Sequence, residues 1–87
     1  FVGTAPAVLI YVADFSRVAG NSAGEKESYA SVDTGYISQN VYLYCASEGM
    51  ATVVLGSIDR AAIGKRLNLD ASRRVMFTQP VGYRKKP

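Results

Sequence analysis

The sequence predicts a layered domain in which strands and helices alternate, in the order strand, helix, strand, helix, strand. Three short apolar runs rich in β-forming residues, at 7–13, 51–55 and 75–81, predict the strands. A long apolar stretch at 29–48 has spacings of three, four and seven residues and predicts a helix, and residues 60–67 predict a second one. Such alternation is typical of helices packed on the faces of a sheet. With 87 residues, the chain amounts to one small domain at most.

The first predicted strand, residues 7–13, is an unbroken apolar run between Pro6 and Asp14. Pro6 fits the start of a strand, where a missing N–H is tolerated. A run without polar alternation is typical of a strand that is buried on both faces, and we expect that here. Residues 15–27 then contain two glycines and scattered polar side chains, which predict a loop.

The long helix is expected to begin at Tyr29, with Ser28 as its N-cap, and to end at Glu48, with Gly49 as the stop. Its apolar residues cover most of the circumference, and a helix that is apolar all round is normally a buried one. Gly35 lies inside it, where glycine costs about 1 kcal/mol relative to alanine. We therefore expect another part of the protein, or another subunit, to approach the helix closely.

After the helix, the chain is expected to form a strand, a turn and a second helix. Residues 51–55 predict a short buried strand, and the turn at 56–57 follows it. Asp59 is a good N-cap for the helix at 60–67. The residues of that helix expected to face the core are Ala62, Ile63 and Leu67.

The third strand, residues 75–81, has Pro80 near its end. Gly82 and Tyr83 follow and are expected to turn the chain outward. A basic cluster comes directly after them, and such a cluster either receives an anionic ligand or is a solvated tail. Its members are Arg84, Lys85 and Lys86.

Composition excludes several kinds of site. The chain has no histidine, so these residues supply neither a histidine-based triad nor a histidine metal ligand. The single Cys45 excludes an internal disulfide and a cysteine metal site, and we interpret it as a small buried apolar residue. The acidic residues show no paired-carboxylate spacing, no dinucleotide or P-loop motif occurs, and no apolar run is long enough to span a membrane. Gln39 and Asn40 lie mid-helix and need hydrogen-bond partners if they are buried.

A nucleic-acid-binding domain is one alternative, suggested by the net charge of +3, the basic C-terminus and the interspersed tyrosines. We set it aside because the tyrosines follow the helix pattern. The charges are also mixed elsewhere, with ten basic against seven acidic residues in the chain.

The best place for a ligand is the turn after the second strand. There a strand end meets a glycine turn that leads into a helix, and ligands often bind at such places in layered folds. Gly56 lets a flat ligand come close to the backbone, whose exposed N–H groups could donate to the polar edge of that ligand. The residues by themselves therefore predict half of a ligand-binding domain.

Three groups of residues also form an ordered pattern along the chain. They are Ala5 and Pro6 with Ala13 and Asp14; Asp33, Thr34 and Gly35 with Ser38, Gln39 and Asn40, followed by Ala46, Ser47, Glu48, Gly49, Met50, Thr52 and Gly56; and Pro80, Val81, Gly82 and Tyr83 with Lys85. Together they resemble the C-terminal half of the FMN-dependent nitroreductase family, and most closely its short nitroreductase-like and SagB-type dehydrogenase members. The resemblance covers nearly the whole chain apart from residues 21–27.

The resemblance implies an α+β fold, a nitroreductase-like three-layer α-β-α sandwich with a mixed sheet. Residues 1–87 would be the C-terminal part of that single domain. An obligate homodimer through the helix at 29–48 is implied, with FMN at the interface, together with the N-terminal part of the same protein. The family's N-terminal element for the flavin phosphate and ring is absent from these residues.

The resemblance also implies cofactor-binding residues. The family loop beside the flavin ring corresponds to Val54, Leu55, Gly56 and Ser57. The basic residue that reaches the FMN phosphate corresponds best to Lys85, with Arg84 as second choice. Close relatives tend to have proline where Arg84 stands.

The implied activity is that of an oxidoreductase that takes a hydride from NAD(P)H and passes electrons to a small organic acceptor, such as a nitroaromatic or a quinone, in a ping-pong mechanism. Because the flavin performs the chemistry, no catalytic side chain and no metal are expected. The alternative is a non-catalytic flavin- or ligand-binding dimerisation module of the same fold. We expect a cytoplasmic protein with neither nucleic acid nor membrane as a partner.

Overall fold

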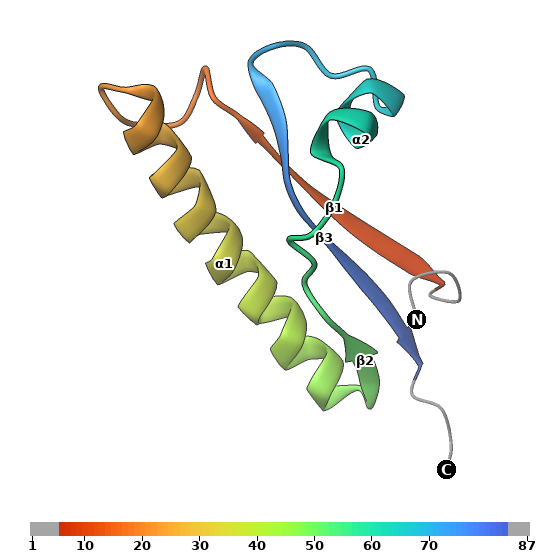
Figure 1. The fold of residues 1–87 in the computed structure, drawn as a ribbon. Coiled ribbons are helices and arrows are strands. Elements are labelled where there is room, and N and C mark those ends of the chain that lie inside the picture. The colour runs from red at the N-terminus through yellow and green to blue at the C-terminus, as the bar shows by residue number, and fades with distance from the viewer. Residues whose placement is uncertain (1–5, 84–87) are drawn as a thin grey trace.

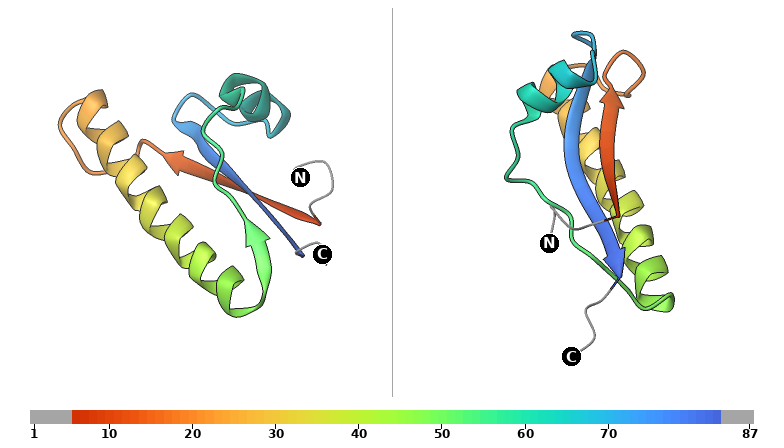
Figure 2. Two further views of the ribbon diagram at one scale, coloured as in Figure 1. Left: turned by 60° about the horizontal axis from the view of Figure 1, so that its bottom comes forward. Right: turned by 90° about the vertical axis from the view of Figure 1, so that its right-hand side faces the viewer.

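The structure of the protein is a computed structural model that describes residues 6–83 (Figure 1). Three strands and two helices follow in the predicted order: β1 (Ala7–Asp14), α1 (Ala23–Ser47), β2 (Met50–Thr52), α2 (Arg60–Arg66) and β3 (Arg73–Tyr83). Helix α1 runs along one face of the sheet, whereas α2 lies at the end of the sheet where β3 begins (Figure 2).

The sheet has the strand order β1-β3-β2, so the C-terminal strand lies in its middle. β3 pairs antiparallel with the whole of β1 and with the whole of β2. The register with β1 shifts between Tyr11 and Val12, because β3 has one extra residue, Met76, at that point. Since both ladders among the described residues are antiparallel, a mixed sheet would require a further strand from outside them.

Helix α1 begins earlier than predicted. Its N-cap is Ser22, and Ser28 lies inside the helix. The Ser22 hydroxyl accepts a hydrogen bond from the Glu25 N–H at 3.2 Å, and the Glu25 carboxylate accepts one from the Asn21 N–H at 2.9 Å. This reciprocal arrangement is close to a capping box, and it stabilises a helix start within a segment that its glycines marked as loop. Gly49 follows the helix with a φ of +68°, which confirms it as the stop.

The described residues do not bury α1 on all sides, so the all-round burial predicted for it depends on another part of the protein or another subunit. Only one narrow stripe of the helix is buried, because the described residues place a sheet on only one side of it. A Cβ on Gly35 would have nothing within 4 Å, so no described residue makes the close approach expected there. The buried stripe consists of Ala30, Thr34, Ser38 and Cys45. The large side chains that are exposed, which we call the exposed apolar set of α1, are Tyr29, Val32, Tyr36, Ile37, Leu43 and Tyr44.

Strand β1 is likewise not buried on both faces, contrary to the prediction. It is an edge strand, and its side chains alternate between the two faces of the sheet. Val8, Ile10 and Val12 share one face and are each 38–42% exposed. An apolar sheet face of this kind normally lies under another layer, which the described residues do not provide.

The segment after β2 does not continue as a strand, contrary to the prediction for residues 53–55. The chain leaves the sheet after Thr52 and returns for a single bridge at Leu55. The N–H of Leu55 donates to the Thr78 carbonyl at 2.7 Å, and the Thr78 N–H donates to the Leu55 carbonyl at 3.2 Å. At the other end, Gly82 and Tyr83 pair with β2 and do not turn outward as expected.

Pro80 lies inside the central strand, where proline is rare. The gap between β2 and the Leu55 bridge explains it. The backbone N–H and C=O of Thr78 point toward Leu55. Residues two positions apart in a strand direct these groups to the same side, so the backbone nitrogen and C=O of Pro80 face that side too. Pro80 therefore lacks its N–H where the neighbouring chain has left the ladder. Its carbonyl on that side accepts a hydrogen bond from the Thr52 hydroxyl at 2.8 Å.

Helix α2 begins as predicted, since the Asp59 carboxylate accepts a hydrogen bond from the Ala62 N–H at 3.0 Å. Its predicted packing is wrong: Ala62 and Leu67 are exposed, and Ile63 is only half-buried. The physical reason is its place at the end of the sheet, where it packs mainly on β3.

The core is small and lies between the N-terminal half of α1 and the sheet. No helix within residues 6–83 has the length and apolar character that crossing a membrane requires. The core consists of Phe15, Ala30 and Met76, with Tyr11, Ala13, Val18 and Phe77 packed around them.

Candidate functional site

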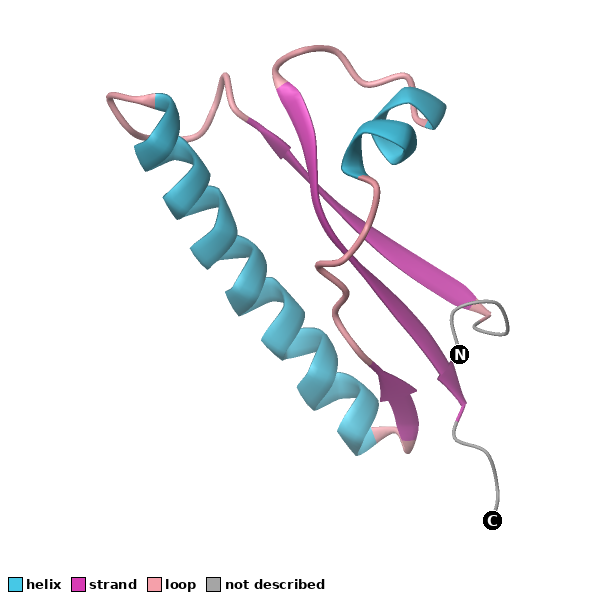
Figure 3. Cartoon of the chain, in the orientation of Figure 1, coloured by secondary structure: helices cyan, strands magenta, loops and turns pink. Residues whose placement is uncertain are grey.

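The predicted ligand-binding turn is part of an extended loop that runs from β2 to α2 (Figure 3). Two contacts hold this loop in place. The backbone bridge between Leu55 and Thr78 attaches it to β3. The phenolic oxygen of Tyr42, from α1, accepts a hydrogen bond from the Val54 N–H at 2.8 Å. The loop is thus anchored both to the central strand and to the long helix, although it belongs to neither.

Gly56 is exposed, and its backbone lies close to the aromatic ring of Phe77. A Cβ on Gly56 would be 3.3 Å from Cε1 of Phe77, which is tighter than an ordinary van der Waals contact. The Gly56 carbonyl accepts a hydrogen bond from the Ile58 N–H at 3.0 Å. Among the described residues, the N–H groups of Gly56 and Ser57 form no hydrogen bond. The loop therefore presents two consecutive free backbone donors at an exposed position.

The structure brings four of the six predicted site residues together. Val54 and Leu55 are half-buried, and Gly56 and Ser57 are exposed on the same loop. The other two predicted residues, Arg84 and Lys85, lie outside the described residues, so their relation to the loop stays a prediction.

A cavity of about 260 Å³ lies between α1 and β3, directly beside the loop. Val54 and Phe77 form part of its wall, and the rest comes from α1. Sequence reasoning missed the two aromatic residues involved here, because Tyr42 and Phe77 each occupy one apolar position in a regular pattern. The α1 residues of the wall are Ser31, Thr34, Gly35, Ser38, Gln39 and Tyr42.

A buried amide connects three elements beneath the loop. Gln79 on β3 is fully buried, and its Oε1 accepts hydrogen bonds from the Tyr11 hydroxyl at 2.5 Å and the Ser38 hydroxyl at 2.8 Å. Its Nε2 has no partner among the described residues. Burial raises the pKa of Tyr11, so this phenol is a neutral donor. Gln39 and Asn40 are exposed and need no buried partner.

Cys45 is buried and unpaired, as expected of a small apolar residue of the helix. Acidic and cysteine side chains do not gather in any group of three within residues 6–83 that could hold a metal ion. The chemistry that the described residues offer is therefore hydrogen bonding from the loop backbone, next to an aromatic ring.

With this geometry established, similarity to other proteins identifies the family. The sequence profile of the Nitroreductase family matches residues 1–83. The chain belongs to the nitroreductase family. Its relative MJ1384 from Methanocaldococcus jannaschii, whose name places it among the nitroreductases, is 35% identical over 57 residues. That match covers 66% of this chain and 29% of the relative.

Solved structures confirm the nitroreductase α+β fold. The crystal structure of a protein from Ralstonia eutropha JMP134 that is named as a nitroreductase superposes with a TM-score of 0.84 at 26% identity, covering 92% of this chain and 38% of that one. A nitroreductase family protein from Clostridium difficile 630 also gives a TM-score of 0.84, at 19% identity, and covers 99% of this chain and 49% of that one. The chain thus spans between about a third and a half of the length of these relatives.

Proposed function

We propose that this nitroreductase-family chain belongs to an FMN-dependent oxidoreductase that passes electrons from NAD(P)H to a small organic acceptor, such as a nitroaromatic or a quinone, by a ping-pong mechanism. The remaining part of the same protein would complete the domain. The observation that carries the proposal is the anchored loop of residues 54–57, whose two N–H groups at Gly56 and Ser57 are unpaired among the described residues. The sequence resemblance matches this loop to the flavin-contacting loop of the family.

The loop suits the edge of a flavin ring. The carbonyl oxygens and N5 of an oxidised flavin accept hydrogen bonds, and Gly56 and Ser57 offer unpaired N–H donors. Because Gly56 has no side chain, a flat ring system can approach its backbone. Tyr42 and Thr78 hold the loop, so little conformational freedom is lost when a ligand binds.

When bound, FMN would supply the hydride and electron transfer, and the chain's residues would orient it. The N–H groups of Gly56 and Ser57 would hold the polar edge of the ring. Lys85 or Arg84 would provide the cation for its phosphate. NAD(P)H as the reductant agrees with the cytoplasmic location expected from the sequence.

The exposed apolar set of α1 supports a homodimer as part of the proposal. Contiguous apolar surface of this kind marks an interface with another protein surface. Tyr36, at 71% exposure, and Leu43, at 59%, are the clearest members. A second copy of the chain would cover them, and the N-terminal part of the same protein would cover the face of β1 that carries Val8, Ile10 and Val12.

The decisive experiment is a visible absorption spectrum of the full-length gene product. We expect a flavin spectrum that bleaches when NADH or NADPH is added under nitrogen. A colourless protein that also fails to take up added FMN would contradict the proposal. Bound flavin without reduction by either nucleotide would favour the non-catalytic module instead.

A further inference from the structure

A second cavity, of about 300 Å³, lies near the end of the sheet where β3 begins. The start of β3, the N-terminal half of α1 and the first residue of α2 surround it. Two arginines, Arg60 and Arg74, line it, so we call it the two-arginine cavity. Its size falls at the lower end of the range for small-molecule sites.

Both guanidinium groups are held in place by aromatic rings. Cζ of Arg74 lies 4.6 Å from the centre of the Phe15 ring, and Cζ of Arg60 lies 5.4 Å from that of Phe77. Nε of Arg60 also donates to the Met76 carbonyl at 3.0 Å. Stacking of this kind fixes the plane of the guanidinium and leaves its edge nitrogens available.

Neither arginine has an anionic partner within the described residues. The ion pairs formed there join Arg17 and Arg73 to Asp14, both at 4.0 Å. Glu27 lines the same cavity but pairs with neither Arg60 nor Arg74. The cavity thus carries two cations against one carboxylate, a net charge that suits a singly charged anion better than a phosphate dianion.

Apart from Ser31, the rest of the wall is apolar. Val75 and Met76 are buried residues of β3, and the ring of Phe77 continues the wall toward the loop of residues 54–57. A Cβ on Gly56 would be 3.9 Å from Nη2 of Arg60, so this guanidinium lies beside the loop itself. A ligand here would have its charged end at the arginines and its body against β3.

We propose that the two-arginine cavity binds the carboxylate of a small aromatic acid. A planar carboxylate matches the two-pronged edge of a guanidinium, and the apolar wall receives a ring. That the acid is an electron acceptor rests on the proposed function, because it depends on flavin bound at the neighbouring loop.

Benzoate is the direct probe, because it carries the carboxylate and cannot be reduced. Calorimetric titration of the full-length gene product should show benzoate binding, and the neutral amide benzamide should bind at least about tenfold more weakly. Arg60→Gln and Arg74→Gln should each weaken benzoate about tenfold. Arg66→Gln, which removes the same charge from an exposed position of α2 outside the cavity, should change the affinity less than about twofold.

Glu27→Gln provides a test in the opposite direction. It removes the carboxylate from the cavity and leaves both arginines in place, so benzoate should bind several times more tightly. Because Glu27 is exposed, the variant should fold normally. Equal affinity for benzoate and benzamide, or equal weakening by Arg60→Gln and Arg66→Gln, would overturn the proposal.

The visible spectrum of the same samples separates this inference from the proposed function. Benzoate binding by a protein without flavin would leave the cavity proposal standing and contradict the oxidoreductase. A flavin protein that does not bind benzoate would contradict the cavity proposal alone. In a flavin protein that binds benzoate, Arg60→Gln should raise the KM for 4-nitrobenzoate about tenfold and leave that for nitrobenzene unchanged. An equal effect on both acceptors would show that Arg60 does not bind the carboxylate.

Discussion

The hydroxyl of Tyr42 and the backbone N–H of Val54 form a hydrogen bond of 2.8 Å that connects the C-terminal part of helix α1 to the loop of residues 54–57. The loop carries no regular ladder of its own, so this bond and the Leu55–Thr78 bridge determine its position. The helix that we propose as the dimer interface is therefore also a support of the proposed flavin site.

Tyr42→Phe should loosen the loop. The variant leaves the Val54 N–H without its acceptor, which costs about 1–3 kcal/mol if the group stays buried. We expect weaker FMN binding and a lower free energy of unfolding, measured by flavin titration and by urea denaturation. Tyr44→Phe is the matched control, since Tyr44 is an exposed tyrosine of the same helix. Equal effects of the two variants would mean that the Tyr42 hydroxyl does not position the loop.

Gly56→Val should impair flavin binding. Its Cβ would meet Cε1 of Phe77 at 3.3 Å, and its methyl groups would occupy the surface that a flat ring needs. Gly64→Ala is the control, because a Cβ there has its nearest neighbour, Leu69 Cδ1, at 4.0 Å and the helix gains about 0.5–1 kcal/mol. The measurement is the flavin content of the two purified variants compared with that of the parent protein. Unchanged flavin content in Gly56→Val would remove this loop from the proposed site.

Ser38→Ala and Tyr11→Phe should destabilise the protein in a coupled way. Each removes one of the two donors to the buried Oε1 of Gln79, at a cost of about 1 kcal/mol. The double variant leaves that oxygen unsatisfied, so its loss should exceed the sum of the single losses. Urea denaturation of the four proteins measures the coupling. Ser47→Ala, at an exposed serine of α1, is the control, and strictly additive losses would contradict a shared network.

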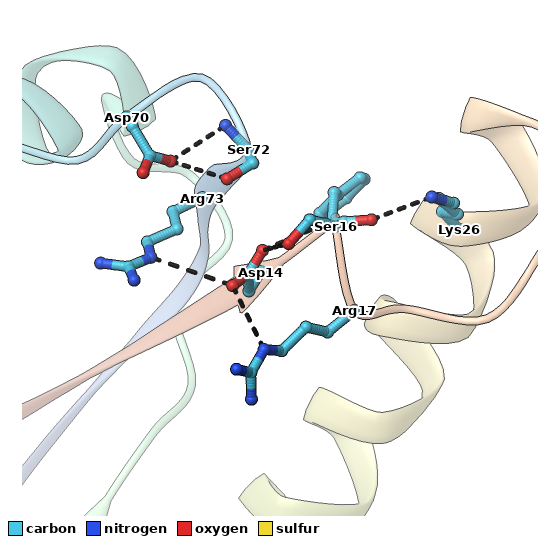
Figure 4. A network of polar contacts seen from close by, with 8 residues as sticks. Asp14, Ser16, Arg17, Lys26, Asp70, Ser72 and Arg73 are labelled. Carbon is cyan, nitrogen blue, oxygen red and sulfur yellow. Dashed lines mark hydrogen bonds and ion pairs between the residues drawn. The ribbon is translucent and has the colours of Figure 1, made fainter.

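The carboxylate of Asp14 should make stability depend on pH in the acid range (Figure 4). The Ser16 hydroxyl and N–H, together with Arg73 and Arg17, hold the pKa of Asp14 below its usual 3.8. A folded-state pKa below the unfolded one gives stability that is complete above the unfolded pKa and is lost as the pH falls through the folded one.

Asp14→Asn removes this titration and should flatten the decline in stability as the pH drops below about 4. Thermal unfolding midpoints across the acid range measure it. Asp33→Asn, the same substitution at an exposed position of α1, is the matched control. A decline as steep in Asp14→Asn as in the parent protein would show that another carboxyl is responsible. Asp70, whose pKa the Ser72 hydroxyl and N–H lower in the same way, is then the next to replace.

Tyr36→Asp should dissociate the proposed homodimer. A charge in a covered apolar interface is costly, whereas one on a free surface is nearly neutral. Sedimentation velocity of the full-length protein should show a smaller species. Leu67→Asp places the same charge at another exposed apolar residue, after α2, and should leave the mass unchanged. A dimer that persists in Tyr36→Asp would contradict α1 as the interface.

Local chemistry determined much of the secondary structure. Asp59 capped α2 as expected and Gly49 ended α1, because both act through the hydrogen bonds of their own neighbours. The start of α1 was missed, although Ser22 and Glu25 have the spacing of a capping box. The glycines beside them predict a loop when the sequence is considered without its tertiary contacts.

The order of the elements and the family could be read from the sequence alone, and the prediction of a ligand at residues 54–57 comes from the same source. Those follow from periodicity, capping residues and an ordered motif, all of which are local. That β3 is the central strand, that Tyr42 joins α1 to the loop of residues 54–57, and that Gln79 joins α1 to the sheet emerges only from the folded chain. Such contacts join residues that are separated in the chain. A single apolar or polar residue in a regular pattern does not indicate which residue it will contact. The burial of α1 and β1 could not be predicted for the same reason, because the covered area of each element depends on what packs against it.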